Sequence, residues 1–377
     1  MDIDAAELSA RGSDRSDALG LVFEPAPEPV PPEERARRIA DPGFGRVFTD
    51  HMAVIEYDQE QGWHSARITA RESFAIDPAC PVLHYAQEIF EGLKAYNRPG
   101  DAVALFRPDA NARRFASSAR RLAMPELPEE MFLESIRSLV RTERGWIPET
   151  EDGSLYLRPF MFANGAFLGV KPSSKYTYAV VASSVGPYFK GDAPNIALWA
   201  TREFIRAAPG GTGAAKCGGN YAASLLPHAE AIRNGCDQVV FLDAIERRWI
   251  EELGGMNIFF VFDDGSIQTP PLTDTILAGI TRDSLLTLAR DMGLAVREER
   301  YSIEQWEADA RSGRLTEAFA CGTAAVVTPI GSVKSAEGEF RIGGQSSGPL
   351  TMRLRTALVD IQRGTAPDPY GWVETID

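Results

Sequence analysis

One lysine in this chain, Lys216, lies in a run of glycines and alanines, and a tyrosine follows five residues later. The segment reads Gly210-Gly-Thr-Gly-Ala-Ala-Lys-Cys-Gly-Gly-Asn-Tyr221. A lysine that forms a Schiff base reacts as the neutral amine and needs close approach of the backbone, which glycine permits. The pattern favours a nucleophilic lysine in a built pocket. A flexible surface loop with an incidental lysine is the alternative.

The same segment also resembles a phosphate-binding P-loop. That motif needs glycine directly before the lysine and serine or threonine directly after it. Here Ala215 and Cys217 occupy those two positions. The sequence therefore argues against a nucleotide-binding P-loop protein.

Two neighbouring acids, Glu251 and Glu252, end a predicted strand just before a glycine pair. A carboxyl buried there would take up a proton, or would keep a cationic ring nitrogen protonated, as a pyridinium cofactor requires. Because successive residues of a strand point to opposite faces, only one of the two acids points inward. We expect the other to be solvated.

Three segments could bind a phosphate. Thr281 begins a predicted helix, where the amides of Ile280 and Thr281 and the threonine hydroxyl could hold an anion, although an N-cap threonine needs no ligand. The turn Phe319-Ala-Cys-Gly-Thr-Ala324 could add N–H donors. Most of the arginines between residues 105 and 115 should lie on a solvated helix face, but one could pair with phosphate.

The composition sets limits on function. The chain has 377 residues, 44% of them hydrophobic, which is enough for two domains with a cleft between them. A formal net charge of −14 argues against binding to nucleic acid or to anionic membranes. The four cysteines are widely spaced and form no metal-type cluster, so we expect no metal. The acidic N-terminus lacks the apolar run of a signal peptide, which favours a cytoplasmic protein.

The organisation along the chain predicts an α/β (α+β) protein in two domains. We expect a flexible arm over residues 1–40, a first domain over 41–183, a connection over 184–192 and a second domain over 193–377. Periodicity predicts strands and helices in both domains. The strands are expected at 51–57, 154–162, 196–199, 238–242, 249–253 and 257–262, and the helices at 111–124, 129–144, 222–234, 281–291 and 351–363.

Taken together, these motifs resemble those of the branched-chain amino acid aminotransferases, which are fold type IV pyridoxal-phosphate enzymes. The resemblance covers nearly the whole chain after residue 41. It implies a small α/β domain, a larger pseudo-barrel α/β domain, and the cofactor at the domain interface. The supporting motifs are Phe48-Thr-Asp-His-Met52, Leu83-His-Tyr-Ala-Gln-Glu-Ile-Phe-Glu-Gly-Leu-Lys-Ala-Tyr96, Leu155-Tyr-Leu-Arg-Pro159, the Lys216 segment, Glu251-Glu-Leu-Gly-Gly-Met-Asn-Ile-Phe259 and Phe319-Ala-Cys-Gly-Thr-Ala324.

The resemblance implies a role for each cofactor-binding residue. Lys216 would form the Schiff base with pyridoxal 5′-phosphate and then move the proton between the substrate α-carbon and the cofactor. Tyr221 would bind the phenolic oxygen of the cofactor, and Glu252 would keep the ring nitrogen protonated. The phosphate ligands implied are Arg114, Ile280, Thr281 and Thr323.

The resemblance also implies a substrate pocket and a homodimer. Tyr85 and the backbone around Gly255 and Ala324 would receive the α-carboxylate, and Arg158 the second carboxylate of glutamate or 2-oxoglutarate. One pocket must accept an aliphatic and an acidic side chain, so an apolar wall should surround a single cation. The wall residues implied are Phe44, Phe90 and Tyr156, and Leu168-Gly-Val170 would complete the partner subunit's pocket.

Three positions depart from the family pattern. Gly255 stands where many relatives carry threonine, so a side-chain contact to the carboxylate is lost. Cys217 follows the lysine where a bulky apolar residue is expected, and we interpret it as a small packed side chain. Ala325-Val-Val-Thr328 replaces the redox CxxC pair of some animal relatives, which favours a bacterial-type enzyme.

The predicted function is reversible transamination of L-leucine, L-isoleucine and L-valine with 2-oxoglutarate, by a ping-pong route. A D-amino acid aminotransferase or an aminodeoxychorismate-lyase-like enzyme of the same fold would share the lysine and the acid. A non-catalytic binding module would be expected to have lost Lys216, Tyr221 or Glu252, and all three are present.

Overall fold

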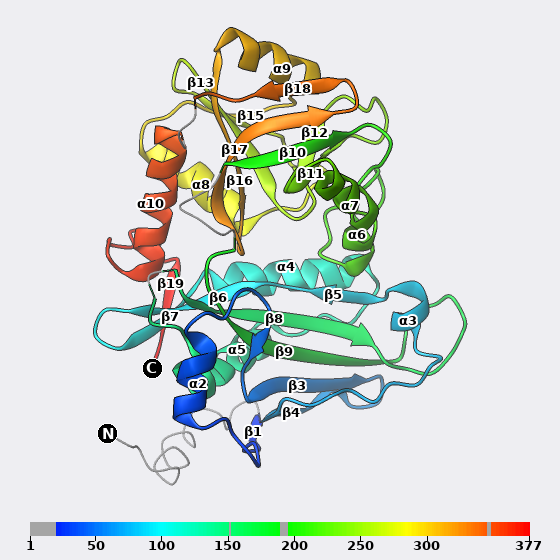
Figure 1. The fold of residues 1–377 in the computed structure, drawn as a ribbon. Coiled ribbons are helices and arrows are strands. Elements are labelled where there is room, and N and C mark those ends of the chain that lie inside the picture. Colours follow the sequence, from blue (N-terminus) through cyan, green and yellow to red (C-terminus); the bar gives the residue numbers. More distant parts are fainter. Residues whose placement is uncertain (1–19, 151, 189–194, 345–347) are drawn as a thin grey trace. The chain divides into compact units, whose positions relative to one another are not determined.

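The computed structural model describes residues 20–150, 152–188, 195–344 and 348–377 (Figure 1). The chain forms two compact units. Unit 1 consists of Met1–Asn97, Ala102–Gly186 and Thr375–Asp377, and unit 2 of Arg98–Asp101 and Pro187–Glu374. The predicted connection begins inside strand β9 (Lys175–Val185), and its residues 189–192 lie outside the described residues.

Unit 1 contains a ten-stranded sheet within the described residues. Its order is β1-β4-β3-β9-β8-β6-β7-β19, with β2 beside β9 and β5 beside β8. The strands, besides β9, are β1 (Val22–Phe23), β2 (Val47–Phe48), β3 (His51–Asp58), β4 (Gly62–Ala70), β5 (Glu88–Phe90), β6 (Leu93–Arg98), β7 (Ala102–Phe106), β8 (Ser154–Ala163) and β19 (Val373–Ile376). The helices are α2 (Pro32–Ile39), α3 (Pro81–Tyr85), α4 (Pro108–Arg121), α5 (Glu129–Glu143) and the 3-10 turn η2 (Arg144–Trp146).

Helices α4 and α5 cover this sheet because each presents an apolar stripe at helical spacing (Figure 1). Phe115 of α4 lies 5.3 Å from Phe132 of α5 and 5.5 Å from Tyr178 of β9, measured between ring centroids. All three side chains are buried. The predicted helix at 111–124 begins three residues earlier, because Pro108 occupies its first turn, where the missing N–H costs nothing.

Part of the expected flexible arm has regular structure. Strand β1 pairs in parallel with β4, and α2 follows it. Two side chains at the start of β3 hold the arm: Asp50, directly before the strand, accepts a hydrogen bond from the Val30 amide at 3.0 Å, and His51 accepts one from the Ala26 amide at 2.9 Å. The expected arm therefore contains regular elements at Val22–Phe23 and Pro32–Ile39, and residues 1–19 lie outside the described residues.

Unit 2 contains a nine-stranded sheet within the described residues. Its order is β12-β11-β10-β17-β16-β13-β14-β15, with β18 beside β17. The strands are β10 (Ile196–Thr201), β11 (Gln238–Leu242), β12 (Ile250–Leu253), β13 (Asn257–Phe262), β14 (Ile267–Thr269), β15 (Val296–Glu298), β16 (Leu315–Gly322), β17 (Val326–Ser335) and β18 (Gly338–Arg341). The helices are α6 (Gly218–Ala222), α7 (Leu225–Arg233), α8 (Ile280–Asp291), α9 (Ile303–Ser312) and α10 (Pro349–Arg363).

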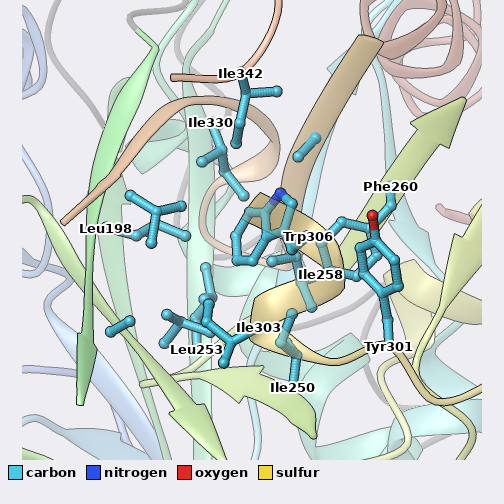
Figure 2. Close-up of a cluster of buried hydrophobic side chains, with 14 of the residues drawn as sticks. Leu198, Ile250, Leu253, Ile258, Phe260, Tyr301, Ile303, Trp306, Ile330 and Ile342 are labelled. Atoms are coloured by element: carbon cyan, nitrogen blue, oxygen red, sulfur yellow. The ribbon is translucent and has the colours of Figure 1, made fainter. Parts of the chain in front are cut away.

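A cluster of buried hydrophobic side chains supports this second sheet. Figure 2 shows Trp306 of α9 among Leu198 of β10, Ile258 of β13 and Ile330 of β17. The Trp306 ring meets Phe260 edge-on, with 5.0 Å between ring centroids. This packing fixes strands β12 and β13, whose ends carry candidate site residues. The mixed α/β fold class predicted from the sequence is confirmed.

Candidate active site

Lys216 and Tyr221 are in direct contact. Lys216 Nζ donates a hydrogen bond to the Tyr221 hydroxyl at 2.8 Å and lies 5.2 Å from the centre of the tyrosine ring. Tyr221 belongs to the short helix α6, which begins directly after Cys217. Cys217 is buried, as expected of a small packed side chain. The spacing of five residues therefore places an amine and a phenol at one point.

The glycines before Lys216 allow a close backbone approach. A Cβ atom at Gly213 would lie 2.5 Å from both Cα and O of Thr275, so only glycine fits there. The Ala214 amide donates to the Asp274 carbonyl at 2.9 Å in the same region. The interpretation that the glycines serve close packing of this loop is confirmed at Gly213. Gly219, by contrast, has open space around its Cα.

A buried asparagine, Asn220, fixes the same loop. Its amide nitrogen donates to the carbonyls of Thr212 and Ala215, each at 2.8 Å, and its oxygen accepts from the Thr212 hydroxyl at 2.8 Å. Asn220 is 4% exposed. Sequence reasoning missed this residue, although an asparagine next to the tyrosine in a glycine-rich segment is a usable signal for a loop clamp.

Glu252 is the buried acid of the pair at the end of β12. Its Oε1 lies 2.7 Å from Nη1 of Arg206 and accepts a hydrogen bond from the Leu277 amide at 3.0 Å. Burial raises the pKa of Glu252 to about 7, while Arg206, the Leu277 amide and Lys216 oppose that rise. The acid is therefore poised to change its charge near neutral pH.

Glu251 behaves differently from the prediction. Its Oε1 accepts a hydrogen bond from the Thr275 hydroxyl at 2.6 Å, and its Oε2 is buried with no hydrogen-bond partner among the described residues. Burial raises the pKa of Glu251 as well. The expectation that the second acid is solvated is wrong, because the segment before α8 covers this edge of the sheet.

The N-terminus of α8 lies close to β13. A Cβ atom at Gly279 would lie 1.9 Å from Oδ1 of Asn257, so glycine is required directly before Ile280 and Thr281. Asn257 in turn pairs with Cys321 of β16. The first amides of this helix therefore lie near the end of β16, where the turn containing Thr323 and Ala324 begins.

Gly255 joins this turn to the tyrosine. A Cβ atom at Gly255 would lie 3.6 Å from Cε1 of Tyr221, and one at Gly322 would lie 3.7 Å from the Gly255 carbonyl. The structure thus brings Tyr221, Gly255 and the turn after β16 together in unit 2. A Cβ atom at position 255 would make only an ordinary van der Waals contact.

Arg114 of unit 1 is held by a buried acid that sequence reasoning did not single out. Arg114 Nε donates to Glu91 Oε1 at 2.6 Å and Nη2 to Oε2 at 2.9 Å. Glu91 is fully buried, and Arg113 instead pairs with Asp109 on the surface. One of the three arginines is therefore set apart from the solvated face. A glutamate directly before the Gly92 turn was the available signal.

The expected wall residues form one group in unit 1. The Arg158 guanidinium lies 4.8 Å from the Phe90 ring and 5.3 Å from the Tyr156 ring, and it donates to the Tyr156 hydroxyl at 2.9 Å. Phe44 meets Tyr156 with 5.2 Å between ring centroids. Arg158 Nε is buried and has no hydrogen-bond partner among the described residues. An arginine among three aromatic rings suits a carboxylate in an otherwise apolar environment.

Tyr85 lies beside the loop that contains Leu168 and Val170. Its hydroxyl donates to the Leu168 carbonyl at 2.5 Å. Leu168 is 66% exposed and Val170 is 86% exposed. Apolar side chains so exposed, next to a tyrosine, form a surface that another molecule can cover.

In the part of the chain that the structure describes, no group of histidine, cysteine and acidic side chains could hold a metal ion. No described helix has the length and apolar character needed to span a bilayer.

A lysine hydrogen-bonded to a tyrosine, with a buried acid and a helix N-terminus in the same unit, suits an enzyme that uses an amine as its nucleophile. The chain belongs to the class IV aminotransferases, since residues 88–333 match the family described as Amino-transferase class IV. A probable branched-chain-amino-acid aminotransferase of Streptomyces coelicolor is 53% identical over 357 residues, covering 94% of this chain and 98% of the relative.

Solved structures agree with this assignment. The branched-chain amino acid aminotransferase from Escherichia coli is 30% identical, with a TM-score of 0.70, and the match covers 87% of this chain and 99% of that one. The branched-chain amino acid aminotransferase from Thermobaculum terrenum, solved in its PLP form, is 26% identical, with a TM-score of 0.69 over 87% of this chain and 98% of that one. The predicted family and its two-domain fold type IV class are confirmed.

Proposed function

We propose that this chain is a pyridoxal-phosphate-dependent transaminase that exchanges amino groups reversibly between L-leucine, L-isoleucine or L-valine and 2-oxoglutarate. The observation that carries the proposal is the Lys216–Tyr221 hydrogen bond in the same unit as the buried acid Glu252. The names of the relatives support the substrate class, and the Thermobaculum terrenum structure supports the cofactor.

The residues of unit 2 fit this cofactor. When bound, pyridoxal phosphate supplies an aldehyde for the amine and a pyridine ring that accepts electrons from the substrate α-carbon. Lys216 Nζ is the base that carries the proton, and the Tyr221 hydroxyl orients that nitrogen. The described contacts of Glu252 both use Oε1, and Oε2 would hold the protonated ring nitrogen.

The phosphate group of the cofactor requires hydrogen-bond donors and a positive charge. The first amides of α8, at Ile280 and Thr281, together with the Thr281 and Thr323 hydroxyls, provide neutral donors. Arg114 provides the positive charge, and its two hydrogen bonds to Glu91 fix the direction of its guanidinium. Such charge-assisted hydrogen bonds contribute about 1.5–3 kcal/mol each.

Arg158 is the proposed partner of the distal carboxylate of glutamate or 2-oxoglutarate. Phe44, Phe90 and Tyr156 provide the apolar contacts for branched aliphatic side chains. The α-carboxylate is assigned to Tyr85 and to the backbone at Gly255 and Ala324. We further propose a cytoplasmic homodimer in which Leu168 and Val170, both exposed in one chain, contact the partner.

Visible absorption of the purified protein with pyridoxal phosphate tests the function. We expect L-leucine to bleach the cofactor band and 2-oxoglutarate to restore it. A response to D-alanine without one to L-leucine would assign the chain to a D-amino acid aminotransferase. The absence of any band would refute the cofactor assignment.

A further inference from the structure

Arg206 is a buried cation that touches three separate segments of unit 2. Its side chain is 2% exposed, and Nη1 lies 2.7 Å from Glu252 Oε1. Nη1 also donates to the Thr275 carbonyl at 2.8 Å, and both Nη1 and Nη2 donate to the Gly213 carbonyl at 3.3 Å. Among the described residues, Glu252 is the acid that forms an ion pair with Arg206, and the Arg206 charge also lowers the pKa of the neighbouring Glu251, against the rise caused by burial.

These segments are the ones that carry the proposed chemistry. Gly213 lies three residues before Lys216, in the loop that packs without a gap against Thr275. Thr275 lies five residues before Ile280, where α8 begins. Glu252 ends β12. The Arg206 guanidinium therefore contacts the Lys216 loop at Gly213, the acid Glu252, and the segment before α8 at Thr275.

We propose that Arg206 is a positioning residue: it holds Glu252 Oε1 as a charged acceptor and keeps the Lys216 loop and the segment before α8 in register with that acid. The inference rests on the proposed function for its catalytic consequence. Arginine suits the role because its planar fork donates to several acceptors at once and stays charged when buried. A lysine at this position would keep the charge but not the fork.

Electrostatically, Arg206 favours the charged form of Glu252, which burial disfavours. Among the described residues, the ionisable groups that act on Glu252 or are acted on by it include Arg206, Lys216, Glu251 and Cys321. Arg206 is the strongest of the groups that favour its charged form. Removing the guanidinium leaves Glu252 buried without its main counter-charge, and the acid then takes up a proton at higher pH.

The first experiment follows Glu252 in the full chain without cofactor. Infrared difference spectra against Glu252→Gln report the carboxyl C=O band of that acid as pH is raised. We expect Arg206→Gln to move the midpoint upward and Arg206→Lys to leave it close to that of the parent protein. Arg282→Gln is the matched control, because Arg282 is also buried and pairs with a carbonyl, Pro270, and a carboxylate, Glu298, at 2.8 and 2.9 Å.

An unchanged midpoint in Arg206→Gln, or an equal shift in Arg282→Gln, would overturn the proposal. If Arg206→Gln does not fold, Arg206→Lys decides the question. Lysine keeps the positive charge, so a midpoint clearly higher than that of the parent protein would refute the role of charge. This titration needs neither cofactor nor turnover. It therefore stands even if the proposed function fails.

The second experiment is a double-mutant cycle on the loaded enzyme. Arg206→Gln should lower kcat/KM by about tenfold or more in the parent background but by less than about threefold in Glu252→Gln, since interacting residues are not additive. Arg206→Lys should weaken pyridoxal phosphate binding while keeping the pH profile, because the carbonyl contacts to the lysine loop are lost. Equal losses in both backgrounds would contradict the coupling and reduce Arg206 to a structural residue.

Discussion

Each unit of this protein buries one arginine–glutamate pair at its candidate site residues, and the two pairs are built in opposite ways. In unit 1, Glu91 uses both oxygens: Arg114 binds each of them, and Asn111 adds a hydrogen bond to Oε2 at 2.7 Å. In unit 2, the described contacts of Glu252 with Arg206 and the Leu277 amide all use Oε1. In unit 1 the acid orients its arginine, whereas in unit 2 the arginine positions the acid.

The difference teaches how to separate anchoring from chemistry when the residue types are identical. Glu91 is fully buried and accepts a hydrogen bond from Arg114 at each oxygen, so its contacts serve to orient Arg114. Glu252, whose described contacts use only Oε1 and whose pKa is raised by burial to about 7, can exchange a proton with a ligand. The predictions below test this contrast.

The largest expected effect is that of Glu252→Gln on catalysis. The amide keeps the shape of the side chain but removes the charge that would keep a ring nitrogen protonated. We expect kcat to fall on the order of 10³-fold, the size of a lost electrostatic contact at a reacting centre. Steady-state kinetics at saturating cofactor measures this fall in kcat. A loss below about tenfold would contradict the claim that Glu252, unlike Glu91, takes part in the chemistry.

Glu91→Gln should act on stability and cofactor affinity instead. It removes one partner of a buried ion pair, which typically costs about 3 kcal/mol or more in the free energy of unfolding. Urea denaturation measures that cost. With cofactor saturating, kcat should stay within about tenfold of the parent value, since Arg114 orients rather than reacts. A kcat as low as that of Glu252→Gln would remove the distinction.

The pH dependence of stability should carry the signature of Glu252 in protein freed of cofactor. Its folded pKa lies above its unfolded one, so the folded state holds the extra proton between the two values. The stabilisation that the folded state gains from protonated Glu252 is fully present below about pH 4.3. The free energy of unfolding then decreases as the pH rises through about 7. Urea unfolding across this range should show the fall in the parent protein, and Glu252→Gln should lack it.

Gly213→Ala sharpens the comparison by testing the loop that Arg206 holds. The added Cβ would lie 2.5 Å from the Thr275 backbone, so the loop must move. We expect a loss of about 1–3 kcal/mol in unfolding free energy and slower reaction of Lys216 with pyridoxal phosphate. Gly219→Ala is the control, since a Cβ there meets no atom within 4 Å. Equal effects of the two changes would argue against a close-packed loop.

The sequence predicted local features well because local patterns determine them. The strands at Gln238–Leu242 and Asn257–Phe262 have the predicted bounds, and both are buried and rich in β-branched or aromatic residues. The predicted helix at 222–234 corresponds to α7, which begins only at Leu225, because the chain turns at Ala223 and Ser224 after the short helix α6. The glycine-rich lysine loop was recognisable from its composition alone.

What the sequence did not reveal are pairings across space. Arg206 lies 46 residues before Glu252, in a stretch without periodicity, and only the fold shows that it is buried. The order in residues 22–39 likewise depends on Asp50 and His51, which bind amides of Val30 and Ala26. Local composition there indicates disorder, and tertiary hydrogen bonds override it.

Borohydride reduction of the protein loaded with pyridoxal phosphate, followed by peptide mapping, tests the central claim most directly. The account predicts a phosphopyridoxyl group on Lys216 alone, no label in Lys216→Ala, and loss of the label when L-leucine is added before reduction. A label on another lysine, or one that L-leucine does not remove, would contradict the account.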